Sequence, residues 1–195
     1  YLPNKSQIEF KTLISQELDV EDMLRTALEY MLRRLGPTNA VVYLPEGEGR
    51  FGIGAYVNYD MTDQDPMPVY RALGNTLCKS MENETGLVRF EDGEAWALAN
   101  EIDAQVLSNA ELIAFACRYR GETLAIMTFF REASFDDSTA GMLDSLRNEL
   151  GTQLGRIVRI HRRGKNEWPA EQSDNDTSNG YEFPDDSSEW GDKAA

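Results

Sequence analysis

Residues 111–131 read ELIAFACRYRGETLAIMTFFR, and this stretch decides the fold. Two apolar segments, at 112–119 and 123–131, flank a tight turn at Arg120-Gly121-Glu122. A strand that is apolar at nearly every position is covered on both faces of its sheet, because its side chains alternate between the faces. The stretch therefore predicts two paired central strands that other elements cover on both sides.

The segment that follows predicts a long C-terminal helix after a short loop at Ser134-Phe135-Asp136-Asp137. Gly151 and Gly155 share one face of this helix, although each costs ~1 kcal/mol relative to Ala in a helix interior. Such a pair predicts close approach by another backbone, either the sheet of the same subunit or the partner helix of a dimer. The apolar stripe on the helix, a candidate dimer surface together with the two glycines, consists of Leu143, Leu146, Leu150, Leu154, Ile157 and Val158.

The rest of the chain predicts an α+β fold. A first helix has Ile8, Leu13 and Ile14 as its apolar residues, and a second begins at the N-cap Asp19 and stops at Gly36-Pro37. The predicted elements, in order, are helices at 6–16 and 19–35, strands at 40–44 and 51–59, a helix at 66–81, a strand at 87–90, and an irregular or weakly helical stretch at 91–110.

Charge and length narrow the class of protein. The chain has 195 residues and a net charge of −15, from 19 Lys and Arg against 34 Asp and Glu. This excess repels phosphate backbones and anionic lipid, so we expect neither nucleic acid nor a membrane as a partner. The length suits one domain of roughly 150 residues plus a tail.

Three regions are predicted along the chain. Residues 1–18 are expected to form a helix or connector from an upstream region. The chain starts at Tyr1 and not at Met, which indicates either a removed leader or, in preference, a piece of a longer polypeptide. Residues 19–163 form the domain. Residues 164–195 form an acidic tail that is too polar to offset the ~1–2 kcal/mol per residue of backbone ordering, and is therefore expected to be disordered.

The tail follows a basic helix end. Residues 165–195 hold nine acidic residues and two lysines. The helix macrodipole alone would justify a few cations before the tail. A further hypothesis is that the tail folds back electrostatically on the helix end, with Trp168 and Trp190 as anchors, or as a short motif for a partner. The basic or potentially basic residues at the helix end are Arg156, Arg159, His161, Arg162, Arg163 and Lys165.

The paired strands around Gly121-Glu122, and the Phe135-Asp136-Asp137 entry into the last helix, resemble a GAF domain over roughly residues 16–163. A PAS-like sensor would give a similar pattern. The resemblance implies a mostly antiparallel sheet of about six strands. It also implies N- and C-terminal helices packed on one face and a ligand cavity on the other. Members of this family bind cyclic nucleotides, bilins, haem or small metabolites, and some only dimerise.

Departures from the family's sequence patterns argue against several of the ligands that its members bind. Asn4-Lys5 lies at the wrong end of the chain for the cyclic-nucleotide constellation. Bilin attachment uses a thiol usually followed by His, whereas Lys79 follows Cys78. Haem needs an axial His, and the sole histidine, His161, lies at the far end of the last helix. We therefore expect no cofactor.

A small-molecule site needs aromatic walls and a few convergent polar groups. On the cavity face of the predicted sheet, Phe90 and Trp96 are candidates for the walls, and Asn100 and Arg118 for the polar groups. The alternative is that these side chains have only structural roles, with Phe90 and Met127 in the core and Arg118 solvated at the end of a strand. The full set of pocket candidates is Tyr70, Phe90, Trp96, Asn100, Arg118 and Met127.

Catalytic and metal chemistry find little support. One histidine leaves few choices for a general base near neutral pH. Cys117 is a small buried hydrophobe or, less readily, a redox thiol activated by nearby arginines. The loop carboxylates Asp60, Asp63 and Asp65 lack the glycine and terminal Glu of a calcium loop, so no metal is expected. The two distant cysteines fit a reduced, cytoplasmic setting.

These observations predict a non-catalytic, GAF-like regulatory domain of signal transduction. It is expected to be a homodimer, to bind a small metabolite and to transmit through its terminal helices to an upstream signalling domain. The alternative is a ligand-free dimerisation scaffold whose acidic tail recruits partners. A redox enzyme that uses Cys117 ranks third.

Overall fold

One antiparallel sheet organises the structure, a computed structural model that describes residues 4–59, 65–102 and 107–167. Its strands lie in the order β2-β1-β5-β4-β3 and pair antiparallel throughout. The strands are β1 (Asn39–Gly47), β2 (Arg50–Val57), β3 (Leu87–Phe90), β4 (Glu111–Tyr119) and β5 (Glu122–Arg131). The helices are α1 (Lys5–Ser15), α2 (Val20–Leu35), α3 (Met67–Met81), α4 (Gly93–Ala99) and α5 (Asp137–Glu167).

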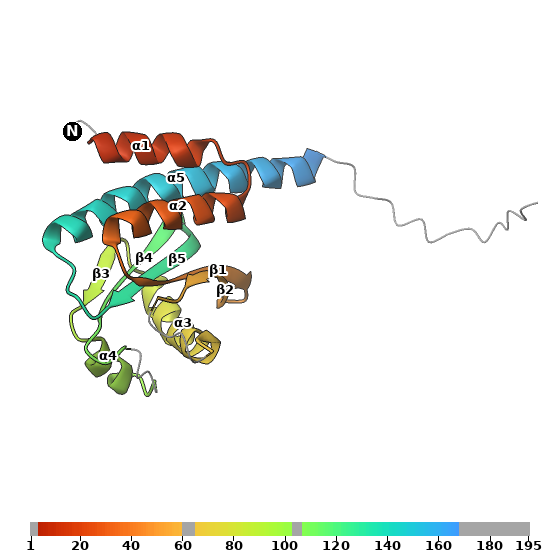
Figure 1. Ribbon diagram of the computed structural model, residues 1–195. Helices are drawn as coiled ribbons and strands as arrows, with labels where there is room; N and C mark the ends of the chain where they lie inside the picture. Colours follow the sequence, from red (N-terminus) through yellow and green to blue (C-terminus); the bar gives the residue numbers. More distant parts are fainter. Residues whose placement is uncertain (1–3, 60–64, 103–106, 168–195) are drawn as a thin grey trace, which may run out of the picture.

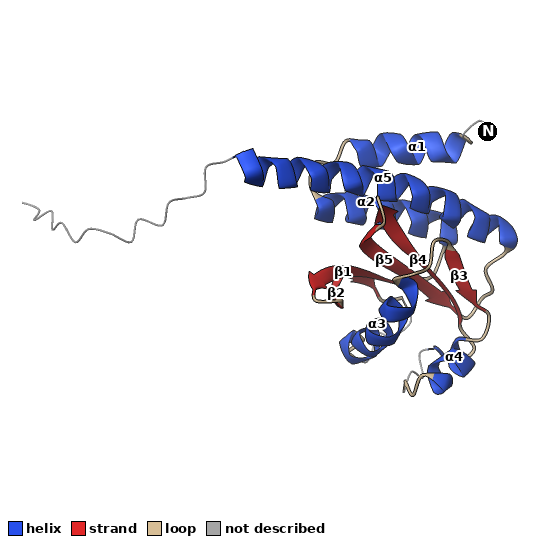
Figure 2. Ribbon diagram, turned by 180° about the vertical axis from the view of Figure 1, so that it is seen from behind, coloured by secondary structure: helices blue, strands red, loops and turns tan. Residues whose placement is uncertain are grey.

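The helices divide between the two faces of the sheet. α1, α2 and α5 lie side by side over one face, and α3 lies against the other (Figure 1). Seen from behind, α4 follows β3 at the end of the sheet remote from the terminal helices (Figure 2). The predicted α+β fold, with terminal helices on one face, is confirmed, although the described residues contain five strands where about six were expected.

β4 and β5 are covered on both faces, as their sequence predicts. Residues of each strand alternate between two cores, one under the terminal helices and one under α3. Phe115 pairs with Met127 on the side of the terminal helices, and the next pair, Ala116 with Ile126, lies on the side of α3. The two strands therefore form the layer that both cores share.

The terminal helices form a continuous layer with a buried underside. On α1, Phe10 and Ile14 are buried, and the Phe10 ring packs 5.1 Å from that of Tyr30 on α2. The Tyr30 hydroxyl donates to the carbonyl of Ser6 at 2.8 Å. By contrast, Ile8 and Leu13, two of the three apolar residues noted in the sequence of this helix, are 54% and 39% exposed. α1 thus packs in the same core as α2 and α5 and presents an apolar outer edge.

A buried carboxylate fixes the start of α5 to the sheet. Glu111 on β4 is 4% exposed and accepts hydrogen bonds from Arg89 Nε on β3 and, at 2.9 Å, from the backbone N–H of Phe135. Arg89 also donates to the carbonyl of Phe135 and, at 3.2 Å, to Asp137. A buried charge needs such partners. The cluster therefore sets where the helix begins relative to β3 and β4.

The two glycines of α5 face the sheet of their own chain. A Cβ atom at Gly151 would lie 2.6 Å from the carbonyl oxygen of Arg118 on β4, and one at Gly155 would lie 2.1 Å from the Tyr119 ring. Such distances are too short for a side chain. The close backbone approach that the pair predicts is thus made within the chain.

This contact predicts opposite effects of the same substitution at two glycines of α5. Gly151→Ala should lower the free energy of unfolding by about 1–3 kcal/mol, because its methyl group has no room against the β4 backbone. Gly141→Ala, in the same helix with nothing within 4 Å of the added atom, should raise it by up to ~1 kcal/mol. Urea unfolding measures both changes. Stabilisation by both variants would show that α5 does not rest on β4.

Candidate functional site

A groove opens between α3 and the β1–β2 hairpin, on the face of the sheet away from the terminal helices. It consists of two adjoining hollows of about 330 and 450 Å³, which share Glu46, Phe51, Gly74 and Asn75 in their walls. Small-molecule sites typically have volumes in the range ~300–1,000 Å³. We call this feature the α3 groove.

The α3 groove depends on close contact between α3 and β1. A Cβ atom at Gly74 would lie 2.4 Å from the Tyr43 ring, so only glycine lets the helix lie directly on this side chain. The Tyr43 hydroxyl donates to the carbonyl of Tyr70 at 2.7 Å. Burial raises the pKa of the Tyr43 hydroxyl, with smaller contributions from Cys78 and Tyr70, so the group stays protonated and remains a donor. Tyr43 thereby forms a fixed floor for the groove.

The walls combine one apolar ring with charged and amide groups. Phe51 supplies the ring, and Glu46 lies across Gly52, where a Cβ atom would come within 1.8 Å of its carboxylate. α3 contributes the guanidinium of Arg71 and the ammonium of Lys79 at the two ends of the groove, with the amide of Asn75 between them. This arrangement can contact the apolar part of a ligand and compensate its negative charge.

The six predicted pocket residues do not converge on one cavity, and none of them lines the α3 groove. Tyr70 is fully buried on the inner side of α3, where its ring packs edge to face against that of Phe130 at 5.9 Å. Met127 lies in the other core, on the side of the terminal helices. Phe90 and Trp96 lie together between β3 and α4, with their rings 5.4 Å apart.

The two polar candidates serve local backbone structure. Asn100 follows the end of α4 and donates to the carbonyl of Trp96 at 2.7 Å. Arg118 donates to the carbonyls of Glu82, at 2.7 Å, and Gly121, at 2.9 Å, which ties the end of α3 to the β4–β5 turn. Both side chains are therefore placed by hydrogen bonds to the main chain outside the α3 groove.

The residues of the α3 groove had weak signals in the sequence. Gly52 and Gly54 interrupt a strand pattern, which indicates a bulge or close contact. Gly54 is the residue left unpaired where the β1–β2 ladder shifts register between Val42 and Tyr43, and Gly52 lies against the Glu46 side chain. Gly74 similarly interrupts the apolar pattern of α3. Arg71 and Asn75 resemble ordinary solvated helix residues, so nothing local distinguishes them.

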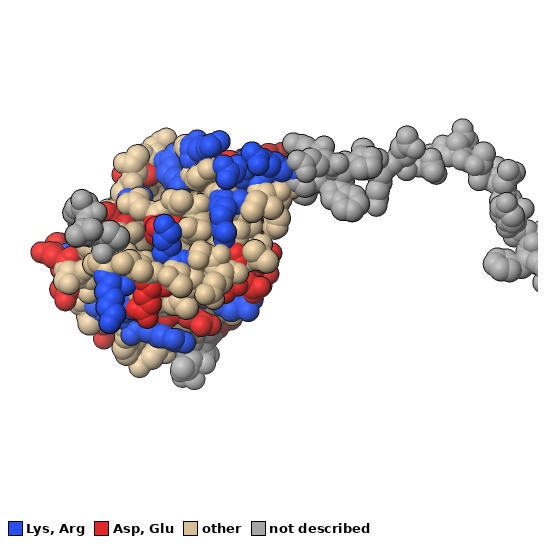
Figure 3. Space-filling model, turned by 90° about the horizontal axis from the view of Figure 1, so that it is seen from above, with Lys and Arg blue, Asp and Glu red and all other residues tan. Residues whose placement is uncertain are grey.

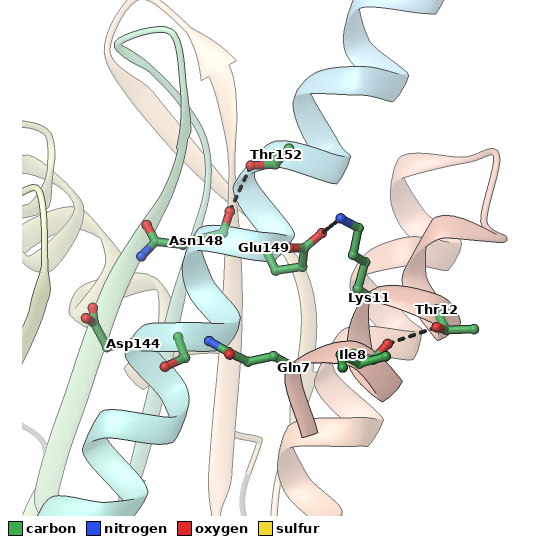
Figure 4. A pocket seen from close by; sticks show the side chains of 9 residues that line it. Gln7, Ile8, Lys11, Thr12, Asp144, Asn148, Glu149 and Thr152 are labelled. Carbon is green, nitrogen blue, oxygen red and sulfur yellow. Dashed lines mark hydrogen bonds and ion pairs between the residues drawn. The ribbon is translucent and has the colours of Figure 1, made fainter. Parts of the chain in front are cut away.

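The predicted dimer residues of α5 lie largely inside the domain. Leu143, Leu146, Leu150, Leu154 and Ile157 are buried in the core, and Val158 is half-buried. The outer side of the helix instead meets α1 in a polar groove of about 710 Å³, the α1–α5 groove (Figure 4). There Lys11 and Glu149 approach to 3.9 Å, while Asp144 and Asn148 line the α5 side and Ile8 lies on the α1 side.

Other kinds of site have little support in the described ranges. No group of three or more His, Cys, Asp or Glu side chains among these residues is placed to hold a metal ion. Asp60 and Asp63 of the predicted acidic loop lie outside the described residues. Within the described ranges, no helix combines enough length with enough hydrophobicity to cross a membrane.

Comparison with known proteins bears on the fold. No family profile matches the sequence, and no curated protein matches it. Among solved structures, residues 122 to 287 of a methyl-accepting chemotaxis protein match with a TM-score of 0.60 and 15% identity, covering 77% of this chain and 98% of that one. The GAF domain/HD domain protein of Geobacter sulfurreducens gives 0.59 and 17%, over 75% and 98% of the two chains.

The fold is that of a GAF domain. The nlh2 GAF domain of A. aeolicus in an inactive state also matches, with a TM-score of 0.52 and 18% identity over 80% of this chain and 97% of that one. The resemblance seen in the sequence is thereby confirmed at the level of architecture. In this GAF fold α3 and the terminal helices lie on opposite faces of the sheet (Figure 1), and the α3 groove lies beside α3.

The two thiols of this GAF fold are predicted to be inert in the folded state. Burial raises the pKa of Cys117 to about 12, and burial together with Glu82 raises that of Cys78 to about 12. A raised thiol pKa means that the reactive thiolate appears only at high pH, so at pH 8 about one thiol in 10,000 is ionised. Iodoacetamide at pH 8 should therefore label neither cysteine in native protein and both in urea. Rapid labelling of native Cys117, seen by mass spectrometry, would instead favour the redox alternative.

Proposed function

We propose that this chain is a non-catalytic sensor domain of a signalling protein, which binds a small anionic metabolite in the α3 groove. Three cationic side chains line the α3 groove, and two of them, Arg71 and Lys79, flank an apolar ring and an amide. Arg50 is paired with Glu48 at 3.5 Å, whereas no described ion pair involves Arg71 or Lys79, so these two charges are available to a ligand. The similarity in fold to a chemotaxis protein supports a signalling role.

The observation that carries this proposal is the alternation of side chains along β1. Tyr43 forms the floor of the α3 groove, and its neighbour Val42 lies in the core beneath the terminal helices. A displacement of β1 by a ligand therefore reaches the terminal helices through one strand. The ligand shifts the packing only as far as its affinities for the two arrangements differ.

A thermal-shift screen against anionic metabolites tests the ligand. A metabolite at 100 times its dissociation constant should stabilise the protein by about 2.7 kcal/mol and raise the melting temperature. Arg71→Ala should weaken this response, because it removes a cation from the groove wall. The control Arg33→Ala removes an exposed cation from α2 and should leave it unchanged. Equal responses in both variants would place the ligand elsewhere.

We further propose that the domain forms a homodimer through the α1–α5 groove and the apolar edge of α1. A two-fold interface must be complementary to itself. The groove offers both signs of charge, Lys11 on α1 and Asp144 and Glu149 on α5, beside the exposed Ile8. The same surface would serve the alternative function, a ligand-free scaffold that only dimerises.

Charge substitution on α1 tests the dimer. Ile8→Glu should convert dimer to monomer in light scattering, because the new carboxylate would be buried against the partner. Leu98→Glu, on the 71% exposed Leu98 of α4, is the matched control and should not change the mass. A monomeric parent protein, or a dimer that tolerates Ile8→Glu, would contradict this interface. Dimerisation without any thermal-shift hit would favour the scaffold.

A further inference from the structure

A third hollow, of about 250 Å³, lies between the β4–β5 hairpin and the last turns of α5. Its floor is apolar and includes Leu124 and Val158, with the Tyr119 ring as one wall. Its rim carries the guanidinium groups of Arg120, Arg159 and Arg163. We call it the basic groove. Lys and Arg side chains gather around this end of α5, where the described part of the chain stops (Figure 3).

Specific contacts build the basic groove. Gly155 leaves room for the Tyr119 ring, since a Cβ atom there would lie 2.1 Å from it. Arg162 donates to both carboxylate oxygens of Glu122, at 3.1 and 2.6 Å, and so fastens the hairpin to the helix. The hydrogen bond from Arg162 lowers the pKa of Glu122, so the carboxylate stays ionised and engaged. The walls are therefore held apart at a fixed spacing.

The rim has positive charge that no described carboxylate compensates. Glu122 is the one acidic residue among those described in the lining, and Arg162 occupies both of its oxygens. Arg159 and Arg163 make no ion pair within the described ranges, and the Arg120 guanidinium lies over the Tyr119 ring at 5.3 Å. An apolar floor beneath three arginines that make no described ion pair matches a segment that combines aromatic side chains with carboxylates.

We propose that the acidic C-terminal segment of this same chain binds in the basic groove. Residues 168–195, which lie outside the described residues, contain eight Asp and Glu, one Lys and four aromatic residues. Residues 181–186 read YEFPDD and place Tyr181 and Phe183 among three carboxylates. An aromatic ring covers the floor of the groove, and the carboxylates pair with the arginines of the rim.

The chain is long enough for this contact. α5 ends at Glu167, and Arg163 and Arg159 lie ~6 and ~12 Å back along the helix at 1.5 Å per residue. The 13 residues between Glu167 and Tyr181 can span up to ~45 Å when extended. Because a tethered segment binds at an effective concentration near the millimolar range, weak individual contacts suffice. Binding would cover the end of α5, a surface unrelated to the α3 groove.

A spin label next to the segment tests the proposal on the full chain. Both native cysteines are buried, at 2% and 0% exposure, so Ser187→Cys provides a selective attachment site. A nitroxide at this position should broaden the amide NMR signals of residues 119–124 and 155–163. The broadening should be lost at high ionic strength, since the Debye length falls from ~10 Å at 0.1 M to ~3 Å at 1 M. Absence of broadening at low salt would overturn the proposal.

Paired variants assign the contact. The test variant, Arg159→Glu with Arg163→Glu, should abolish the broadening. The control variant, Arg25→Glu with Arg33→Glu, changes the net charge by the same amount on the outer side of α2 and should preserve the broadening. Neutralising the segment itself (Glu182→Gln, Asp185→Asn, Asp186→Asn) cannot disturb the described core and should also abolish it. Persistence of the broadening after neutralisation would overturn the role of the carboxylates.

A mixing experiment establishes which copy supplies the segment. Spin-labelled protein without ¹⁵N is added to ¹⁵N-labelled protein that carries no spin label. We expect no broadening in this mixture, because the segment binds its own chain. Broadening in the mixture as strong as within the labelled chain would show docking on a second copy and overturn the proposal. Neither outcome of the mixing experiment depends on ligand binding in the α3 groove.

Discussion

The rest of the structure depends on one constraint, that β4 and β5 must be buried on both faces. Seven consecutive residues of β4, Glu111 to Cys117, are buried, and six of β5. No single layer of helices can cover such strands, so the sheet needs the terminal helices on one side and α3 on the other. A slip of one residue in register would exchange every side chain between the two cores. The hairpin turn and the Arg89–Glu111 pair both oppose such a slip.

The double burial also decides where open volume remains beside α3. Side chains fill the space under the middle of α3, where Tyr43, Tyr70 and Phe130 are fully buried. Open volume remains at the margin, where α3 passes the β1–β2 hairpin and glycines at 52 and 74 replace side chains that would otherwise occupy it. A ligand in this groove would contact the β1–β2 hairpin at the edge of the sheet and the exposed side of α3.

The sequence was sufficient for most of the fold. Asp19 caps α2 as predicted, the strand at 87–90 is found at those residues, and the Gly121-Glu122 turn joins β4 and β5. The candidate site was harder to predict from the sequence. In a strand that is apolar at nearly every position, alternation divides the side chains into two sets but does not say which set faces which layer of helices. Met127 was therefore predicted to face the cavity, whereas it faces the terminal helices. Arg71 and Asn75 line a groove only because the β1–β2 hairpin, which is remote in sequence, lies beside them.

The seat of α5 on β4 has a mechanical consequence. Because Gly151 brings the helix within contact distance of the Arg118 carbonyl, a roll of α5 about its own axis would drive neighbouring side chains into the strand backbone. Sliding along the axis is opposed as well, because the Tyr119 ring lies where any side chain in place of Gly155 would be, and because Arg162 is hydrogen-bonded to Glu122 of the hairpin. With 31 residues the helix is ~46 Å long. A displacement of α5 would therefore carry the β4–β5 hairpin with it.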